Sequence, residues 1–186
     1  MKKTLIALLV SCSAFAGFAA QAADYVFDKP GQHVFITFKA SHLGYSYILG
    51  HFEDFEGRFT YNRDNPEQSK VSVTIETDSL DTDHAERDKH LKGKDYFNAA
   101  KYPTITFVST GFQGTATEGK LVGDLTIKDV TRTVELAVRQ IGEGKDPWGG
   151  YRSGFEGLVT LNAADYGLPD YIGDVEVTLI VEGIRQ

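Results

Sequence analysis

The chain has 186 residues and an acidic balance, with 26 Asp and Glu against 19 Lys and Arg, for a formal net charge of −7 at pH 7. This charge argues against nucleic acid and against anionic membrane surfaces as partners, since both are bound through basic patches. The single cysteine excludes an intramolecular disulfide, so the fold depends on its own hydrophobic core.

Residues 1–22 have the pattern of a secretory signal peptide. Lys2 and Lys3 form a positive n-region, Leu5–Phe18 is an apolar run too short to span a bilayer, and an A-x-A cleavage site ends at Ala22. Cleavage after Ala22 would leave residues 23–186 as a single domain in the periplasm. Loss of the two lysines would take the net charge from −7 to −9.

A lipidated N-terminus at Cys12 is the alternative for this segment. Leu9–Cys12 resembles a lipobox. Cys12 comes very early, however, and Ser13–Ala20 is apolar where a lipoprotein has a polar tether. The pattern therefore favours cleavage at Ala22, and a diacylated Cys12 in an intact mass would overturn it.

Eight segments alternate apolar and polar residues with the period of a β-strand. The connections are too short for helical crossovers, which favours antiparallel neighbours in an up-and-down barrel or a sandwich. Many segments reach about ten residues, roughly 33 Å, which favours the barrel, and eight strands enclose either a packed core or one small ligand. The segments are residues 33–40, 55–62, 71–76, 104–109, 121–128, 133–139, 152–161 and 175–182.

Inward-facing glycines leave the interior of this barrel undecided. Gly57, Gly123 and Gly157 all fall in phase with the apolar face of their strands. They either leave space for a ligand or mark bends that close the barrel.

One stretch, Asp78–Pro103, has helical character. Asp83 and Glu86 have capping-box spacing, and Gly93 ends the run. We expect this insert to cover one mouth of the barrel and to open as a lid. The candidate rim residues, which combine one helical face with two aromatics, are His84, Arg87, Asp88, Leu91, Tyr96 and Phe97.

Arg87 is expected to hold the insert against the barrel through Asp78, Asp81 or Asp88, the alternative being a surface ion pair with Asp83. His84 and Asp88 have i,i+4 spacing that could hold a metal, but no third ligand has suitable spacing, so no metal is predicted. Trp148 is expected to pack over a barrel end.

No catalytic signature is present. With Cys12 removed no cysteine nucleophile remains, and neither Gly-Phe-Glu-Gly nor Gly-Tyr-Arg-Ser-Gly is a nucleophile elbow. Neither an enzyme nor a cofactor is predicted.

Several spaced motifs resemble the YceI-like family of exported lipid-binding proteins over essentially all of residues 23–186. The resemblance implies an all-β fold: an extended eight-stranded antiparallel lipocalin-like barrel with a short helical insert between strands four and five. It also implies a polyisoprenoid or similar long-chain amphipathic lipid inside. The motifs are Ser41–Gly44, Gly50–Gly57, Arg87–Leu91, Asp95–Phe97, Tyr102–Pro103, Phe107–Ser109, Gly123–Thr126, Asp146–Gly150 and Asp165–Gly167.

The resemblance supplies no motif for the ligand-binding residues, so they are inferred from the phase of the strands. The candidate apolar wall is Phe38, His42, Phe52, Phe55, Ile75, Phe107, Leu125 and Phe155.

The prediction is therefore a periplasmic lipid-binding protein, with no stable membrane insertion and with homodimerisation left open. One rival is a small exported enzyme or metal-dependent protein acting on lipid head groups through His84, Asp88 and His90. The other is a packed barrel without a cavity, serving as an interaction module.

Overall fold

The computed structural model describes residues 22–31 and 33–186. The predicted signal peptide up to Gln21, and with it the lipobox alternative, lies outside these residues. The strands are β1 (Ala23–Phe27), β2 (Phe35–His42), β3 (Ser46–Phe52), β4 (Phe55–Tyr61), β5 (Lys70–Glu76), β6 (Leu80–Asp81), β7 (Thr104–Gly114), β8 (Glu118–Ile127), β9 (Val130–Lys145), β10 (Tyr151–Asn162) and β11 (Asp174–Arg185). The one α-helix in the described part of the chain is α1 (Ala85–Leu91), and short 3₁₀ turns cover Pro66–Gln68, Thr77–Ser79, Ala163–Tyr166 and Asp170–Ile172.

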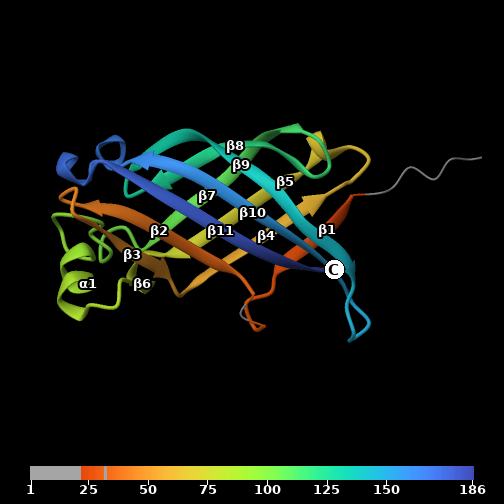
Figure 1. The fold of residues 1–186 in the computed structure, drawn as a ribbon, viewed down its shortest axis with the longest axis horizontal. Coiled ribbons are helices and arrows are strands. Elements are labelled where there is room, and N and C mark those ends of the chain that lie inside the picture. The colour runs from red at the N-terminus through yellow and green to blue at the C-terminus, as the bar shows by residue number, and fades with distance from the viewer. Residues whose placement is uncertain (1–21, 32) are drawn as a thin grey trace, which may run out of the picture.

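The strands form an extended closed barrel (Figure 1). The order around it is β1-β4-β5-β7-β8-β9-β10-β11, and β11 pairs with β1 to close the ring. Every pairing is antiparallel. The predicted eight-stranded antiparallel barrel is confirmed, since full closure leaves no free sheet edge in this ring.

Three barrel strands are interrupted along their length. The last residues of β11 pair with β1, and the first residues of β11 pair with β2. β1 and β2 together therefore form one strand that breaks after Phe27. β3 and β4 likewise form a second interrupted strand, and β5 and β6 form the third. Because β1 and β2 count as one strand, α1 lies between the third and fourth strands of the barrel and not between the fourth and fifth.

Three strand pieces, β1, β3 and β6, escape the sequence pattern, and β6 has only two residues. β1 has five residues directly after the predicted cleavage site, too few to establish a period. β3 carries Tyr47 and Leu49 on its solvent face, and both are exposed, so its apolar residues do not alternate with polar ones.

The start of α1 also differs from the expected capping box. His84 is the cap, and its Nδ1 accepts a hydrogen bond from the Arg87 backbone N–H at 3.2 Å. Asp83 has φ of 58°, and its own N–H donates to Asp81 at 2.6 Å. This left-handed turn before the helix removes Asp83 from the capping position.

Within residues 22–31 and 33–186, no helix is long and apolar enough to cross a bilayer.

Glycines on the inner face of the barrel lie directly against aromatic rings. A Cβ on Gly57 would lie 2.2 Å from the Phe27 ring, and a Cβ on Gly123 would lie 2.4 Å from the Phe107 ring. Gly157 differs, because its nearest neighbour would be Leu136 Cδ2 at an ordinary 3.6 Å. Gly57 and Gly123 therefore provide the space that an aromatic ring occupies, whereas the space beside Gly157 stays open to the interior.

We expect Gly123→Ala to destabilise the barrel by about 1–3 kcal/mol, since the new methyl group overlaps both the Phe107 ring and the Val108 carbonyl. Gly111→Ala is the matched control on the same sheet, because a Cβ there meets nothing within 4 Å. Urea unfolding of both variants measures the difference. Equal midpoints would show that the ring has room to move away.

Candidate functional site

An apolar cavity of about 520 Å³ occupies the interior of the barrel. Its lining extends from Tyr61 and Ala116 at one end to Tyr96 and Tyr171 at the other. Phe, Ile, Leu and Val make most of the wall between these ends. The rival of a packed barrel without a cavity is therefore wrong.

Seven of the eight predicted wall residues line the cavity: Phe38, His42, Phe52, Ile75, Phe107, Leu125 and Phe155. Phe55 does not line it. It stands at the bend between β3 and β4, is buried in the core, and has the Lys29 Nζ 5.3 Å from its ring centroid.

Much of the wall comes from residues that the sequence analysis did not select. They share the inward phase of predicted strands, so the alternation of β2, β9, β10 and β11 could have identified them. They are Ile36, Val134, Leu136, Val138, Gly157, Val159, Leu161, Val175, Val177, Leu179 and Val181.

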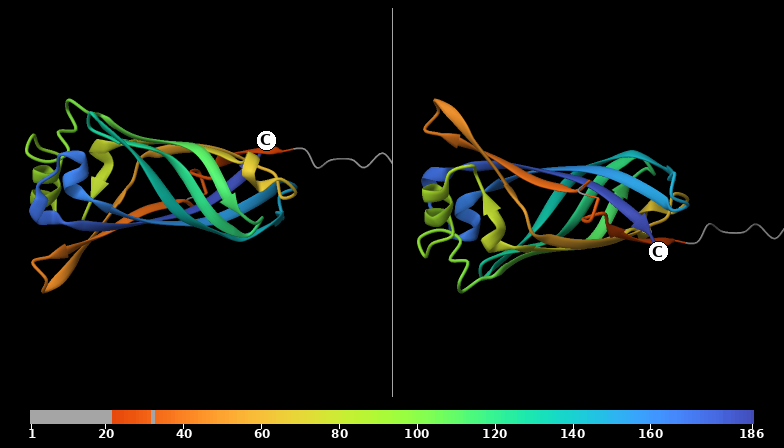
Figure 2. Two further views of the ribbon diagram at one scale, coloured as in Figure 1. Left: turned by 90° about the horizontal axis from the view of Figure 1, so that it is seen from above. Right: turned by 90° about the horizontal axis from the view of Figure 1, so that it is seen from below.

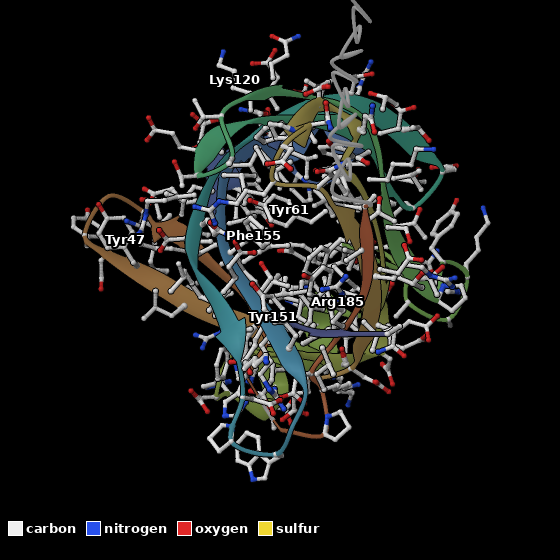
Figure 3. The ribbon with its side chains drawn as sticks, turned by 90° about the vertical axis from the view of Figure 1, so that its right-hand side faces the viewer. Tyr47, Tyr61, Lys120, Tyr151, Phe155 and Arg185 are labelled. Carbon is white, nitrogen blue, oxygen red and sulfur yellow. The ribbon has the colours of Figure 1, made fainter. Side chains whose placement is uncertain are left out.

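Aromatic rings narrow the end of the barrel that carries the C-terminus. Tyr25 stacks on Phe59 at 4.7 Å, and Phe155 meets Phe59 and Tyr61 edge-on at 5.5 and 5.2 Å. Figure 3 shows Tyr61 and Phe155 projecting into the barrel. The Tyr61 hydroxyl donates to the Ala116 carbonyl at 2.9 Å, and burial raises the pKa of Tyr61, so the phenol stays neutral.

The opposite end is covered by the insert that contains α1. Four of the six predicted rim residues line the cavity there: Arg87, Leu91, Tyr96 and Phe97. Phe97 packs edge-on against the wall residue Phe52 at 6.5 Å, and His90, which also lines the cavity, packs against Tyr96 at 4.7 Å.

His84 and Asp88 lie outside the cavity lining. His84 caps α1, and Asp88 is buried, accepting hydrogen bonds from the Thr82 backbone N–H at 3.0 Å and from its hydroxyl. Asp88 therefore binds the chain before the helix, while His84 precedes the helix in an extended conformation and is exposed.

Arg87 binds threonine instead of the expected carboxylates. Its Nε donates to Thr82 Oγ1 at 2.7 Å and its Nη2 to the Thr82 carbonyl at 2.6 Å. Among the described residues Arg87 forms no ion pair, with either the expected partners or Asp83. Arg87 therefore ties α1 to the segment just before the helix. Nothing in the sequence distinguishes Thr82 from other threonines before a helix.

A hydrogen bond between two tyrosines joins the two segments that cover this end. The hydroxyl of Tyr96, on the insert, is bonded to that of Tyr171, on the connection between β10 and β11. This bond, together with burial, raises the pKa of Tyr96. Leu168 and Ile172 of the same connection also line the cavity. Nothing in the sequence singles out Tyr171, because its partner is 75 residues away.

We expect Tyr171→Phe to speed lipid exchange by up to about tenfold, since one hydrogen bond contributes about 0.5–1.5 kcal/mol to keeping the insert in place. Arg87→Ala should also speed exchange more than it lowers stability, because it loosens the insert alone. Stopped-flow transfer of a fluorescent long-chain lipid measures the rates. Tyr151→Phe, at the other end of the barrel, is the control. Unchanged release from both rim variants would show that the insert does not gate the cavity.

The residues of the rival head-group enzyme do not converge. His84 and Asp88 are engaged outside the cavity, while His90 faces it. In the described chain, the group of His, Asp or Glu with three ligand atoms within 4.8 Å of one another is Asp28, His33 and Glu182.

That group is an ion network at the break between β1 and β2. Arg152 Nη1 donates to buried Asp28 and to Glu182, and its Nε donates to Asp146 at 2.9 Å. Burial would raise the pKa of Asp28, but its hydrogen bonds with Arg152 and His33 hold that pKa below its usual value. The same guanidinium lowers the pKa of Asp146.

Trp148 does not pack over the barrel end as expected. Its side chain is 77% exposed, and the Arg152 guanidinium lies 5.3 Å from its ring centroid. The loop between β9 and β10 turns this ring toward the guanidinium, where a cation–π contact replaces burial.

Three comparisons place the fold among known proteins. The sequence profile of the YceI-like domain matches residues 25–183. A UPF0312 protein of Ectopseudomonas mendocina is 52% identical over 192 residues, covering 100% of both chains. The crystal structure of a Campylobacter jejuni YCEI protein superposes with a TM-score of 0.72 at 28% identity, covering 78% of this chain and 90% of that one.

A more distant neighbour carries a ligand class in its description. It is a polyisoprenoid binding domain from Saccharophagus degradans, with a TM-score of 0.63 at 15% identity, covering 89% of this chain and 100% of that one. At this identity the likeness establishes only the shared lipocalin-like barrel. With a profile match over residues 25–183 and a relative at 52% identity over the whole chain, the chain belongs to the YceI-like family.

Proposed function

We propose that this protein binds a polyisoprenoid or a similar long-chain amphipathic lipid inside the barrel and carries or stores it in the periplasm. The observation that supports this most directly is the apolar cavity of about 520 Å³ along the barrel axis. A hydrocarbon tail gains free energy there from leaving water, without needing a specific polar contact. The polyisoprenoid binding named for the Saccharophagus degradans domain supports the ligand class.

A long tail suits this cavity better than a compact ligand. The wall follows β10 from Phe155 to Leu161 and β11 from Val175 to Val181, or roughly 23 Å of strand. Arg87, His90 and Tyr96 bring polar groups to the cavity at the insert, Thr117, Glu118 and Gln140 bring others at the opposite end, and the wall between is mostly apolar. We place the lipid head group near the insert, beside the Arg87 guanidinium, with the tail reaching toward Phe155.

Export is the second part of the proposal. Residues 1–22 would be removed as a signal peptide, leaving residues 23–186 as one lipid-binding domain beginning at Ala23. Intact-mass measurement of the protein from a periplasmic extract tests the cleavage. A mass that retains residues 1–22 would contradict it.

The proposed activity is binding, with no reaction assigned. His84 and Asp88 are already engaged in holding the insert, so they are not available to act on a head group beside His90. A copurifying transition metal with no lipid would favour the enzyme over this proposal.

Native mass spectrometry of protein purified from periplasm, followed by lipid extraction, is the test. We expect a copurifying long-chain lipid, and the same spectra report whether two copies associate. In a homologous series, affinity should rise by about 0.8 kcal/mol for each added methylene until the cavity is full. The total gain will be smaller than the summed contributions because association itself has a cost. A flat series would show that the head group and not the tail is recognised.

A further inference from the structure

The hairpin formed by β2 and β3 extends away from the barrel at the end covered by the insert (Figure 2). Its tip exposes four large apolar or aromatic side chains: Leu43 at 75%, Tyr45 at 88%, Tyr47 at 61% and Leu49 at 66%. Figure 3 shows Tyr47 well outside the ring of strands. We refer to these four residues as the hairpin tip.

The pairing of β3 explains why the hairpin leaves the barrel. On its outer edge β3 pairs with β6 only at His51 and Phe52. From Ser46 to Gly50 the hairpin is therefore held to the barrel only through β2 and its pairing with β11.

The turn itself carries an unfavourable residue. Leu43 has φ of 54° and is followed by Gly44 with φ of 75°. A non-glycine residue in the left-handed region costs free energy, and asparagine or glycine is the usual choice in such a turn. A leucine that is both strained and exposed contributes little to folding, which suggests a role outside the fold.

Charge on the hairpin differs from charge on the chain as a whole. Phe35–Phe52 contains no Asp or Glu, although the chain has 26 of them. Its one lysine, Lys39, is paired with Glu176 at 2.8 Å and lies 4.7 Å from the Tyr47 ring centroid. The tip can therefore leave water without desolvating a carboxylate.

Apolar surface is continuous from the tip into the cavity. Leu43 belongs to both, and His42 and Ile48 of the same hairpin line the cavity. A tail leaving the cavity at this point passes directly onto Leu43.

We infer that the hairpin tip docks on the surface of a phospholipid bilayer and that lipid passes between the bilayer and the cavity beside it. This inference rests on the proposed function and names the source from which the cavity fills. Tyrosine suits the bilayer interface because it combines an apolar ring with a hydroxyl that stays hydrated. The attachment depends on apolar contact, so zwitterionic vesicles suffice despite the acidic chain.

The test uses phosphatidylcholine vesicles with the purified protein. Tyr45→Ser/Leu49→Ser removes two side chains of the tip that do not line the cavity, and Ile141→Ser/Leu158→Ser removes two exposed apolar side chains from the outside of β9 and β10 as the control. Two measurements are made: cosedimentation with vesicles, and transfer of a fluorescent long-chain lipid from vesicles to protein. Uptake of the same lipid from dilute ethanol dispersion measures the cavity alone.

We expect the tip variant to lose vesicle binding and vesicle-to-protein transfer by about tenfold or more. Its uptake from dispersion should equal that of the parent and the control. Absence of vesicle binding by the parent, or equal transfer by all three proteins, would overturn the inference while leaving the proposed function intact.

Two further outcomes separate this inference from its alternatives. A parent dimer that becomes a monomer in the tip variant during sedimentation would show an interface between copies, and the inference would be wrong. Tip-dependent vesicle binding without uptake of lipid by any of the proteins would support docking and would refute the proposed function instead.

Discussion

Replacing Gly157 with phenylalanine should shorten the longest tail that the protein binds. Gly157 lies in the wall on β10, and a Cβ there meets only ordinary contacts, the nearest being Leu136 Cδ2 at 3.6 Å. The new ring would therefore enter the cavity without disturbing the strands. If it displaces roughly four methylenes at about 0.8 kcal/mol each, affinity for the longest tails falls by about 3 kcal/mol, or roughly 200-fold.

Short tails should keep their parental affinity in this variant, because they leave the blocked part of the cavity empty. Binding titrations across a tail-length series make the comparison. Leu158→Phe is the control, since this neighbouring side chain lies on the outer surface and is 47% exposed. Equal affinity of Gly157→Phe and the parent for the longest tails would place the tail elsewhere.

Arg152→Met should lower the free energy of unfolding by about 3–5 kcal/mol at neutral pH, the usual cost of leaving a buried charge without its partner. The variant leaves Asp28 buried, with its carboxyl side chain only 4% exposed, and without its guanidinium. Arg139→Met is the control, because Arg139 forms an exposed ion pair with Glu156 whose loss costs at most about 1 kcal/mol.

The pH dependence of the free energy of unfolding identifies the buried charge of Asp28 as the cause of this loss. The pKa of Asp28 is lowered in the folded protein, so its ion pairing stabilises the fold fully above the unfolded pKa of about 3.9. That contribution is lost as the pH falls through the folded pKa. The difference in the free energy of unfolding between the parent and Arg152→Met should therefore become smaller below about pH 4. A difference that stays constant from pH 7 to pH 3 would assign it to packing.

The strands could be predicted from alternation, and their length favoured a barrel over a sandwich. Its strands bury one face along their whole length, and this period of two is a local property of the sequence. The same phase identified Phe38, Ile75 and Phe107 as wall residues. Phe55 shares that phase, but it is buried in the core beside the break between β3 and β4 and does not line the cavity.

The parts that escaped prediction depend on contacts distant in sequence or on side chains without distinctive chemistry. The bond between Tyr96 and Tyr171 spans 75 residues, and that between Arg152 and Asp28 spans 124. Thr82 engages Arg87 through a hydroxyl that many residues could supply. Arg87 lines the cavity, but its hydrogen-bond partners differ from those expected.

The seating of aromatic rings on glycines also bears on how the barrel folds. A Cβ on Gly50 would lie 2.2 Å from the Phe38 ring, and one on Gly183 would lie 2.4 Å from Phe59, as already seen for Gly57 and Gly123. A hollow interior offers few packing contacts to reject strands that have slipped by two residues, a slip that keeps every side chain on its correct face. Such a slip would press these rings onto side chains in place of glycines. The ring and glycine pairs thus select the native register that an empty core cannot enforce.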